Sequence, residues 1–259
     1  LTERGPLVAR VVLRRSFGDS AIRMDVLLRA DSAAVELQLT VDWRQTHELI
    51  RLICPLARPA VRWAADTSGG VISRPSLPRT ALEQARWEVP VISWLASEQE
   101  APGGGLGVLL DGPQGVDAEP QQLGISLLRG PTWPDPSADQ RWHRHRLALM
   151  PLTNGWYRDG LAQAAIHFRE PGWLGPVDIA NRWQGFPALP TALVPISMRP
   201  DESEDAEQGT VLVQVFNPGG ARVKWATGSE GWWVEGDQSS VSISPGALRE
   251  VRLTPRPLQ

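Results

Sequence analysis

Residues 20–29 read Ser-Ala-Ile-Arg-Met-Asp-Val-Leu-Leu-Arg, and residues 35–41 read Val-Glu-Leu-Gln-Leu-Thr-Val. These two stretches carry the clearest indication of the fold class. Apolar side chains recur at every second position of both stretches: Ile22, Met24, Val26 and Leu28, then Val35, Leu37, Leu39 and Val41. A period of two puts these side chains on one face of an extended chain and the intervening side chains on the other. The pattern therefore predicts half-buried antiparallel β-strands.

The same alternation extends toward the N-terminus, where Leu7, Ala9, Val11 and Leu13 share one face of another predicted strand. Residues 16–20 and 30–33 separate the strands and have the composition of turns, so we expect a three-strand meander. Further strands are predicted at these later positions: residues 107–110, 124–128 and 143–150. The chain has 24 Gly and 23 Pro, and no stretch keeps a 3.6-residue period over three turns, so long helices are not expected. The first 200 residues thus favour an all-β domain, a large antiparallel two-sheet sandwich.

An acidic segment at residues 201–208 lacks large apolar side chains that could anchor it and is predicted to be an exposed loop. It separates the large β domain, residues 1–200, from a small C-terminal β domain, residues 209–259. Short apolar stretches predict the strands of this second domain: residues 211–216, 232–234, 241–243 and 251–253.

Composition limits the classes of function. The net charge is −3, with 26 basic and 29 acidic residues, which does not favour a nucleic-acid partner. No run of about 18 apolar residues is present, so no membrane partner is expected. Cys54 lies in an apolar stretch and is predicted to be a buried thiol, compatible with a reducing, cytoplasmic location. Most of the 12 Trp are expected in the core, although aromatic faces also line sugar sites.

Candidate chemistry is sparse. Carboxylates that could form the pair of a glycosidase are Asp42, Glu88, Asp111, Asp117, Asp135 and Asp139. Asp42 and Glu88 occur in strand contexts and favour structural roles, whereas Asp135 and Asp139 lie in a Pro-rich loop, where turn capping competes with contact to a sugar or a neighbouring domain. His143 and His145 share a strand face, but zinc needs three or four ligands and the sequence gives them no clear companions. No serine-nucleophile, phosphate-loop or zinc-protease motif occurs.

An ordered series of short motifs resembles the C-terminal half of glycoside hydrolase family 38, the α-mannosidases. The segments that carry the resemblance are Glu3-Arg4-Gly5-Pro6, Val41-Asp42-Trp43 with His47, Gly70 with Arg74-Pro75, Trp87-Glu88-Val89-Pro90 with Trp94, Leu127-Leu128-Arg129, Pro134-Asp135-Pro136 with Ala138-Asp139, Phe216-Asn217-Pro218 and residues 250–253. Each motif alone is weakly specific, and the specificity comes from their order and spacing.

The resemblance implies a galactose-mutarotase-like supersandwich followed by a small sandwich. It also implies that zinc, a nucleophilic aspartate and an acid/base aspartate lie in a catalytic domain preceding Leu1, which is this region's expected partner, and that the reaction is retaining hydrolysis of α-mannosides. No catalytic residue and no metal ligand is expected in this chain. Loops of the sandwich would reach the rim of the pocket, and the expected substrate-binding residues are Arg129, Trp133, Asp135, Asp139 and His143.

The sequence also departs from the family pattern. Gly130 replaces the serine that often follows the arginine, and Arg141 replaces a glycine that follows the aspartate-glutamine pair. The segment from Asp111 to Asp117 lacks both tyrosines of the family. Two other interpretations therefore stay open: a free-standing carbohydrate-binding or mutarotase-like protein, and a non-catalytic interaction module.

Overall fold

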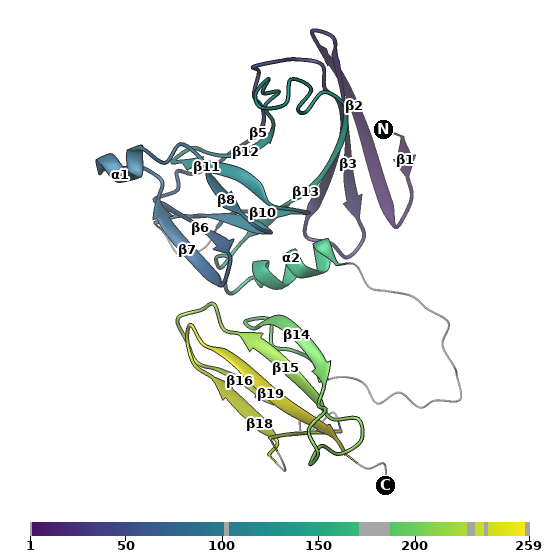
Figure 1. Cartoon of the computed structure of the whole chain (residues 1–259), viewed down its shortest axis with the longest axis vertical. Coiled ribbons are helices and arrows are strands. Elements are labelled where there is room, and N and C mark those ends of the chain that lie inside the picture. The colour runs from purple at the N-terminus through teal and green to yellow at the C-terminus, as the bar shows by residue number, and fades with distance from the viewer. Residues whose placement is uncertain (1, 101–103, 171–186, 227–230, 236–237, 257–259) are drawn as a thin grey trace. The chain divides into compact units, whose positions relative to one another are not determined.

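The predicted meander forms one end of a nine-stranded antiparallel sheet (Figure 1). The computed structural model describes residues 2–100, 104–170, 187–226, 231–235 and 238–256. In order across the sheet the strands are β1 (Glu3–Arg4), β2 (Val8–Phe17), β3 (Ser20–Arg29), β4 (Val35–Asp42), β13 (Trp142–Leu152), β10 (Gly105–Leu110), β9 (Trp94–Glu98), β6 (Arg62–Thr67) and β7 (Gly70–Pro75). The all-β, two-sheet fold class predicted from the sequence is confirmed.

A second, four-stranded antiparallel sheet covers part of the first. Its strands are β5 (Ile50–Pro55), β12 (Gln122–Leu128), β11 (Gln114–Glu119) and β8 (Val89–Val91), in that order. The core between the sheets contains Leu39 and Val41 from β4 and Ile125 from β12, all almost fully buried. Met24 pairs with Leu39 and Ile22 with Val41, so most of the alternating apolar set of β3 and β4 faces this core as expected, whereas Leu28 is 52% exposed. Cys54 is buried beside these residues, and burial raises the pKa of its thiol to about 11.

β2 forms where a strand was predicted, but the burial of its apolar face differs from the prediction. β2 carries Val11 and Leu13 on the same face as the core residues, since Val11 pairs with Val26 and Leu13 with Met24. Nevertheless Leu13 is 52% exposed. The reason is geometric, because four strands cannot cover nine and the shared core ends at β3.

Two helices interrupt the strands of this unit. α1 (Ala81–Gln84) is one turn long and begins with a capping box between Thr80 and Glu83. α2 (Leu161–Arg169) lies against the outer face of the large sheet, where Leu161 and Ala165 are fully buried among residues of β9, β10 and β13 (Figure 1). α2 was not predicted from the sequence and spans only nine residues. No helix in the described ranges is long and apolar enough to cross a membrane.

The chain divides into two units, Leu1–Glu170 and Pro171–Gln259, whereas we expected the boundary at residue 200. The difference has a clear cause. β14 (Val194–Pro200) pairs with β15 (Val211–Phe216) and so belongs to the second unit, and the acidic segment 201–208 is the loop that joins them. Asp201 and Asp205 of this loop both form ion pairs with Arg252, at 2.7 and 3.4 Å.

The second unit is a small antiparallel β structure. One sheet orders its strands as β14, β15, β19 (Leu248–Pro255) and β17 (Trp232–Val234), and another pairs β16 (Val223–Ala226) with β18 (Ser240–Ile243). Trp225 is fully buried in its core, and its indole N–H donates to the Ala188 carbonyl at 3.0 Å. Asn217 is fully buried and holds the turn after β15, because its side chain donates to the carbonyls of Ala221 and Ile243.

Candidate functional site

The loop between β12 and β13, residues 129–141, contains most of the residues predicted to contact substrate, and Asp139 organises it. Asp139 adopts a positive φ of 63°. Its Oδ2 accepts hydrogen bonds from the backbone N–H groups of Arg129 at 2.9 Å and Gly130 at 3.0 Å. Burial alone would raise the pKa of Asp139, but these hydrogen bonds and the nearby charges of His143 and Arg129 lower it. Asp139 is therefore an ionised anchor of the loop. We name residues 129–141 the Asp139 loop.

The Asp139 loop is fixed to the segment that follows β4. The Gly130 carbonyl accepts from the backbone N–H of His47 at 2.8 Å, and Gln140 donates to the Gln45 carbonyl at 2.6 Å. Gly130 has φ 56°, and a Cβ there would run into the Gln45 carbonyl and come within 3.0 Å of Trp43 Nε1. Two of the sequence motifs, Val41-Asp42-Trp43 with His47 and Leu127-Leu128-Arg129, are thus neighbours in space.

His143 joins the same cluster and His145 lies deeper in the sandwich. His143 Nε2 is 2.9 Å from the Asp139 carbonyl oxygen, and the two imidazole rings stack with centroids 6.3 Å apart. Burial, and then the charge of His143, lower the pKa of His145, whose Nε2 is buried without a hydrogen-bond partner. Within the described ranges no group of three or more His, Cys, Asp or Glu is arranged to hold a metal ion.

Trp133 and Asp135, the other two residues predicted to bind substrate, differ in their surroundings. Trp133 is 84% exposed and lines a hollow of about 360 Å³ together with Arg129 and His47. Thr132 Oγ1 lies 3.1 Å from His47 Nε2 at this hollow. Asp135 instead caps a local turn, because its Oδ1 accepts from both the backbone N–H and the hydroxyl of Ser137, at 2.8 Å each. The structure therefore brings Arg129, Asp139 and His143 together and places Trp133 beside Arg129.

All six carboxylates considered as a glycosidase pair have partners in the fold. Asp42 pairs with Arg44, Glu88 with Arg51 and Ser126, Asp111 with Arg146, Asp117 with Arg51, Asp135 with Ser137, and Asp139 with two backbone N–H groups. Glu88 and Asp117 share the guanidinium of Arg51 on the second sheet. Opposite charges and hydrogen bonds of this kind favour ionised carboxylates with structural roles over a proton-donating acid.

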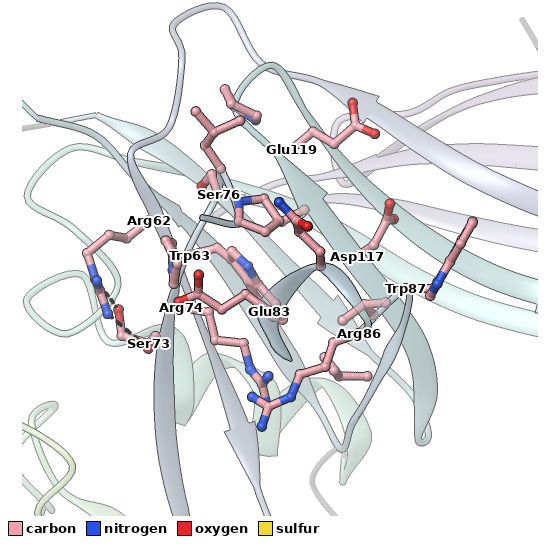
Figure 2. Close-up of a pocket in the computed structure, with 18 residues that line it drawn as sticks. Arg62, Trp63, Ser73, Arg74, Ser76, Glu83, Arg86, Trp87, Asp117 and Glu119 are labelled. Carbon is pink, nitrogen blue, oxygen red and sulfur yellow. Dashed lines mark hydrogen bonds between the residues drawn. The ribbon is translucent and has the colours of Figure 1, made fainter. Parts of the chain in front are cut away.

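The structure also has a larger cleft, which was not predicted from the sequence. It has a volume of about 820 Å³ and lies between β6, β7, α1 and β11 (Figure 2). Trp63, Arg74, Arg86, Trp87 and Glu119 are among its lining residues. These residues come from three separate strands and from the segment after α1, so no local spacing joins them. Arg74 and Trp87 belong to two of the motifs noted in the sequence, but nothing in the sequence indicated that they line one cleft.

The two antiparallel sheets of nine and four strands define the first unit as a β-sandwich domain. Residues 1–137 match the model of the glycosyl hydrolases family 38 C-terminal domain, and the chain belongs to this family. It is 27% identical over 197 residues to human alpha-mannosidase 2C1, an alignment that covers 75% of this chain and 19% of that protein. Alpha-mannosidase G of Dictyostelium discoideum is 26% identical over 174 residues, which are 64% of this chain and 15% of the relative.

Solved structures support the fold. An alpha-mannosidase from Enterococcus faecalis V583 superposes with a TM-score of 0.68 at 14% identity, over 90% of this chain and 29% of that chain. A protein in the glycosyl hydrolase family 38 from Enterococcus faecalis gives a TM-score of 0.58, also at 14% identity, over 90% of this chain and 30% of its own. The chain thus corresponds to less than a third of these structures, and at this identity the likeness concerns the fold.

Proposed function

We propose that this chain is the C-terminal accessory region of an α-mannosidase-like glycoside hydrolase. In this proposal it packs against a catalytic region that hydrolyses α-mannosides with retention, and it supplies no nucleophile or acid/base group. The family match supports the assignment, and the named α-mannosidase relatives extend far beyond the aligned part. All six candidate carboxylates of the sandwich have partners in the fold, which supports placing the nucleophile and the acid/base group in the catalytic region.

The observation that carries the proposal is an uncovered apolar surface. Its exposed fractions are Leu7 72%, Val11 39%, Leu13 52%, Phe17 50% and Leu28 52%, and we name these residues the apolar strip. On β2 and β3 the strip continues the face that forms the core, and the Phe17 ring stacks on the core residue Trp43 with centroids 6.4 Å apart. Arg15 lies on the same face between Leu13 and Phe17. Exposed apolar patches bordered by polar residues mark interaction sites. We assign the catalytic region of the same parent as the occupant, because an interior face that continues beyond its cover is typical of a domain that completes its core against a neighbour.

The Asp139 loop gives this region a second role, at the rim of the substrate pocket. The loop is held by Asp139 and by contacts to residues 45 and 47, so its exposed groups are presented on a fixed backbone. Trp133 offers an apolar ring face of the kind that covers the C–H face of a sugar, and Arg129 lines the same hollow. In this proposal the bulky side chains of Arg141, which stands where the family often has a glycine, and of Trp142 narrow the substrate pocket.

Zinc belongs to the proposed catalytic region. The described residues do not fit a zinc site, because His145 is buried with only His143 stacked against it and no third ligand joins them. No part of the proposed role of this chain passes through the metal.

The test uses the enzyme encoded by the complete reading frame around this chain, assayed for hydrolysis of p-nitrophenyl α-D-mannoside with zinc present. Leu13→Asp and Leu28→Asp place a charge on the apolar strip and are expected to lower the melting temperature and the yield of active enzyme. Leu82→Asp is the matched control, since Leu82 is 67% exposed on α1, outside the strip. Strip variants that behave like the control would refute docking through this surface.

A different result would change the assignment itself. A reading frame that encodes no zinc ligands or catalytic aspartates upstream of Leu1 would contradict the proposal and favour an interaction module. Quenching of Trp fluorescence by millimolar mannose in this chain alone would favour an independent carbohydrate-binding protein.

A further inference from the structure

The cleft shown in Figure 2 holds two cationic side chains at one end. Arg74 comes from the end of β7 and Arg86 from the turn after α1, and their side chains converge in the figure. In the part of the chain that the structure describes, no carboxylate lies within the 4.0 Å ion-pair distance of either guanidinium. Arginine stays charged in proteins, so two positive groups face each other here.

Arg74 is the more constrained of the two. Its Nε is buried and has no hydrogen-bond partner, and its guanidinium carbon lies 6.0 Å from the ring centroid of the buried Trp63. Burial, and then the charge of Arg86, lower the pKa of Arg74. A cation that has lost part of its water without gaining an anion is destabilising, and a bound anion would remove that cost.

The acidic residues of the cleft form no ion pair with either arginine in the described part of the chain, although the charge of Arg86 contributes to the lowered pKa of Glu83. Glu83 Oε2 accepts from the backbone N–H groups of Arg79 at 2.8 Å and Thr80 at 3.0 Å, where it caps α1. Asp117 forms its ion pair with Arg51. Asp117 and Glu119 lie toward the opposite end of the cleft from the two arginines (Figure 2).

The remaining walls suit the neutral part of a small ligand. Trp87 lines the cleft and is 85% exposed, so its ring face is available for stacking. Asp117 and Glu119 present carboxylate oxygens, which accept hydrogen bonds from hydroxyl groups. A volume of about 820 Å³ is within the range of small-molecule sites.

We propose that this cleft binds a phosphorylated sugar, with the phosphate on Arg74 and Arg86, the sugar hydroxyls toward Asp117 and Glu119, and the ring beside Trp87. The planar guanidinium matches phosphate oxygens through paired N–H donors. This site uses none of the residues of the Asp139 loop or of the apolar strip, so the phosphate-binding part of the proposal does not depend on the proposed α-mannosidase role. The choice of mannose as the sugar rests on that role.

The test is isothermal titration calorimetry of the 259-residue chain with mannose 6-phosphate, and with mannose and inorganic phosphate as separate arms. We expect mannose 6-phosphate to bind about tenfold or more tightly than either separate part, because both ends of the cleft are then engaged. Raising the salt concentration is expected to weaken the binding.

Variants assign the binding to the two arginines. Arg74→Gln and Arg86→Gln are each expected to weaken mannose 6-phosphate binding about tenfold. Arg79→Gln is the matched control, because Arg79 is exposed next to the cleft and only its backbone N–H bonds Glu83. If Arg74→Gln does not fold, as judged by circular dichroism, two other variants still test the proposal. They are Arg86→Gln, at an exposed residue, and Arg74→Lys, which keeps the positive charge.

Three results would overturn the proposal: no heat of binding at millimolar mannose 6-phosphate, equal binding by the Arg86→Gln variant, or equal affinity for mannose 6-phosphate and inorganic phosphate. The last result would leave an anion site without recognition of the sugar.

Discussion

Gly130→Ala tests how tightly the Asp139 loop is fixed to its neighbour. Gly130 has φ 56°, a conformation that costs an L-residue about 1–2 kcal/mol. The added Cβ would also run into the Gln45 carbonyl, and this backbone atom cannot move freely because Gln140 donates to it at 2.6 Å. Crowding of this kind costs about 1–3 kcal/mol, so we expect a total destabilisation of about 3 kcal/mol.

Gly69→Ala is the matched control for this prediction. Gly69 also has a positive φ, 85°, but a Cβ there meets nothing within 4 Å. The control should therefore lose only the conformational part, about 1 kcal/mol. The difference between the two variants isolates the contact between the Asp139 loop and residue 45.

The assay is thermal and urea unfolding followed by circular dichroism and Trp fluorescence. For a unit of this size about 1 kcal/mol shifts the melting temperature by about 2–4 °C, so Gly130→Ala should lower it by about 6–12 °C. The transition of the second unit should not move. If the Gly130→Ala variant is as stable as the Gly69→Ala variant, the expected crowding is wrong, and the loop moves away from residue 45 without cost.

Three further predictions concern titratable groups. Asp139→Asn should lower the free energy of unfolding by about 1 kcal/mol at pH 7, because the carboxylate accepts hydrogen bonds from two backbone N–H groups. Since the pKa of Asp139 is lowered in the folded protein, this stabilisation is present above about pH 4 and is lost as the pH falls. In melts at different pH values, the melting temperature of the variant should therefore fall less steeply toward acid pH than that of the unmodified protein. The pKa of His145 is lowered in the folded protein, so as the pH falls below about 6.5 the unfolded chain takes up a proton first and the stability of the fold declines. His145→Gln should remove this part of the decline. An unchanged dependence of the melting temperature on pH in this range would contradict the prediction. Cys54, with its pKa raised to about 11, should resist iodoacetamide at pH 8 in the folded protein and react on unfolding, as mass spectrometry would show.

The sequence predicted the strands of the meander well, because each has an alternating pattern with a turn on either side. It did not predict that the face of Leu13 is uncovered, since alternation reports which side chains share a face and not whether a second layer reaches it. α2 was missed because nine residues give too few repeats for a helical period. The boundary at residue 200 failed to match because the acidic loop is more conspicuous in the sequence than the strand β14 before it.

The candidate site was predictable in part. The order of the motifs led to the Asp139 loop, and turn capping was one of the two roles considered for Asp135 and Asp139; both now accept local hydrogen bonds. The cleft with Arg74 and Arg86 was not predictable, because residues from β6, β7, α1 and β11 meet only after the strands pair.

The ends of the nine-stranded sheet decide how anything can attach to it. At one edge β1 is two residues long and charged, and Glu3 of this strand forms an ion pair with Arg10 at 3.5 Å. At the other edge β7 ends in Pro75, which has no N–H to donate. Short, charged or proline-bearing edges discourage the addition of a foreign strand. Backbone pairing at the edges, which any extended peptide could imitate, is therefore disfavoured. A neighbour is instead recognised by the shape of the side chains on a face of the sheet, where a single substitution can change which neighbour binds.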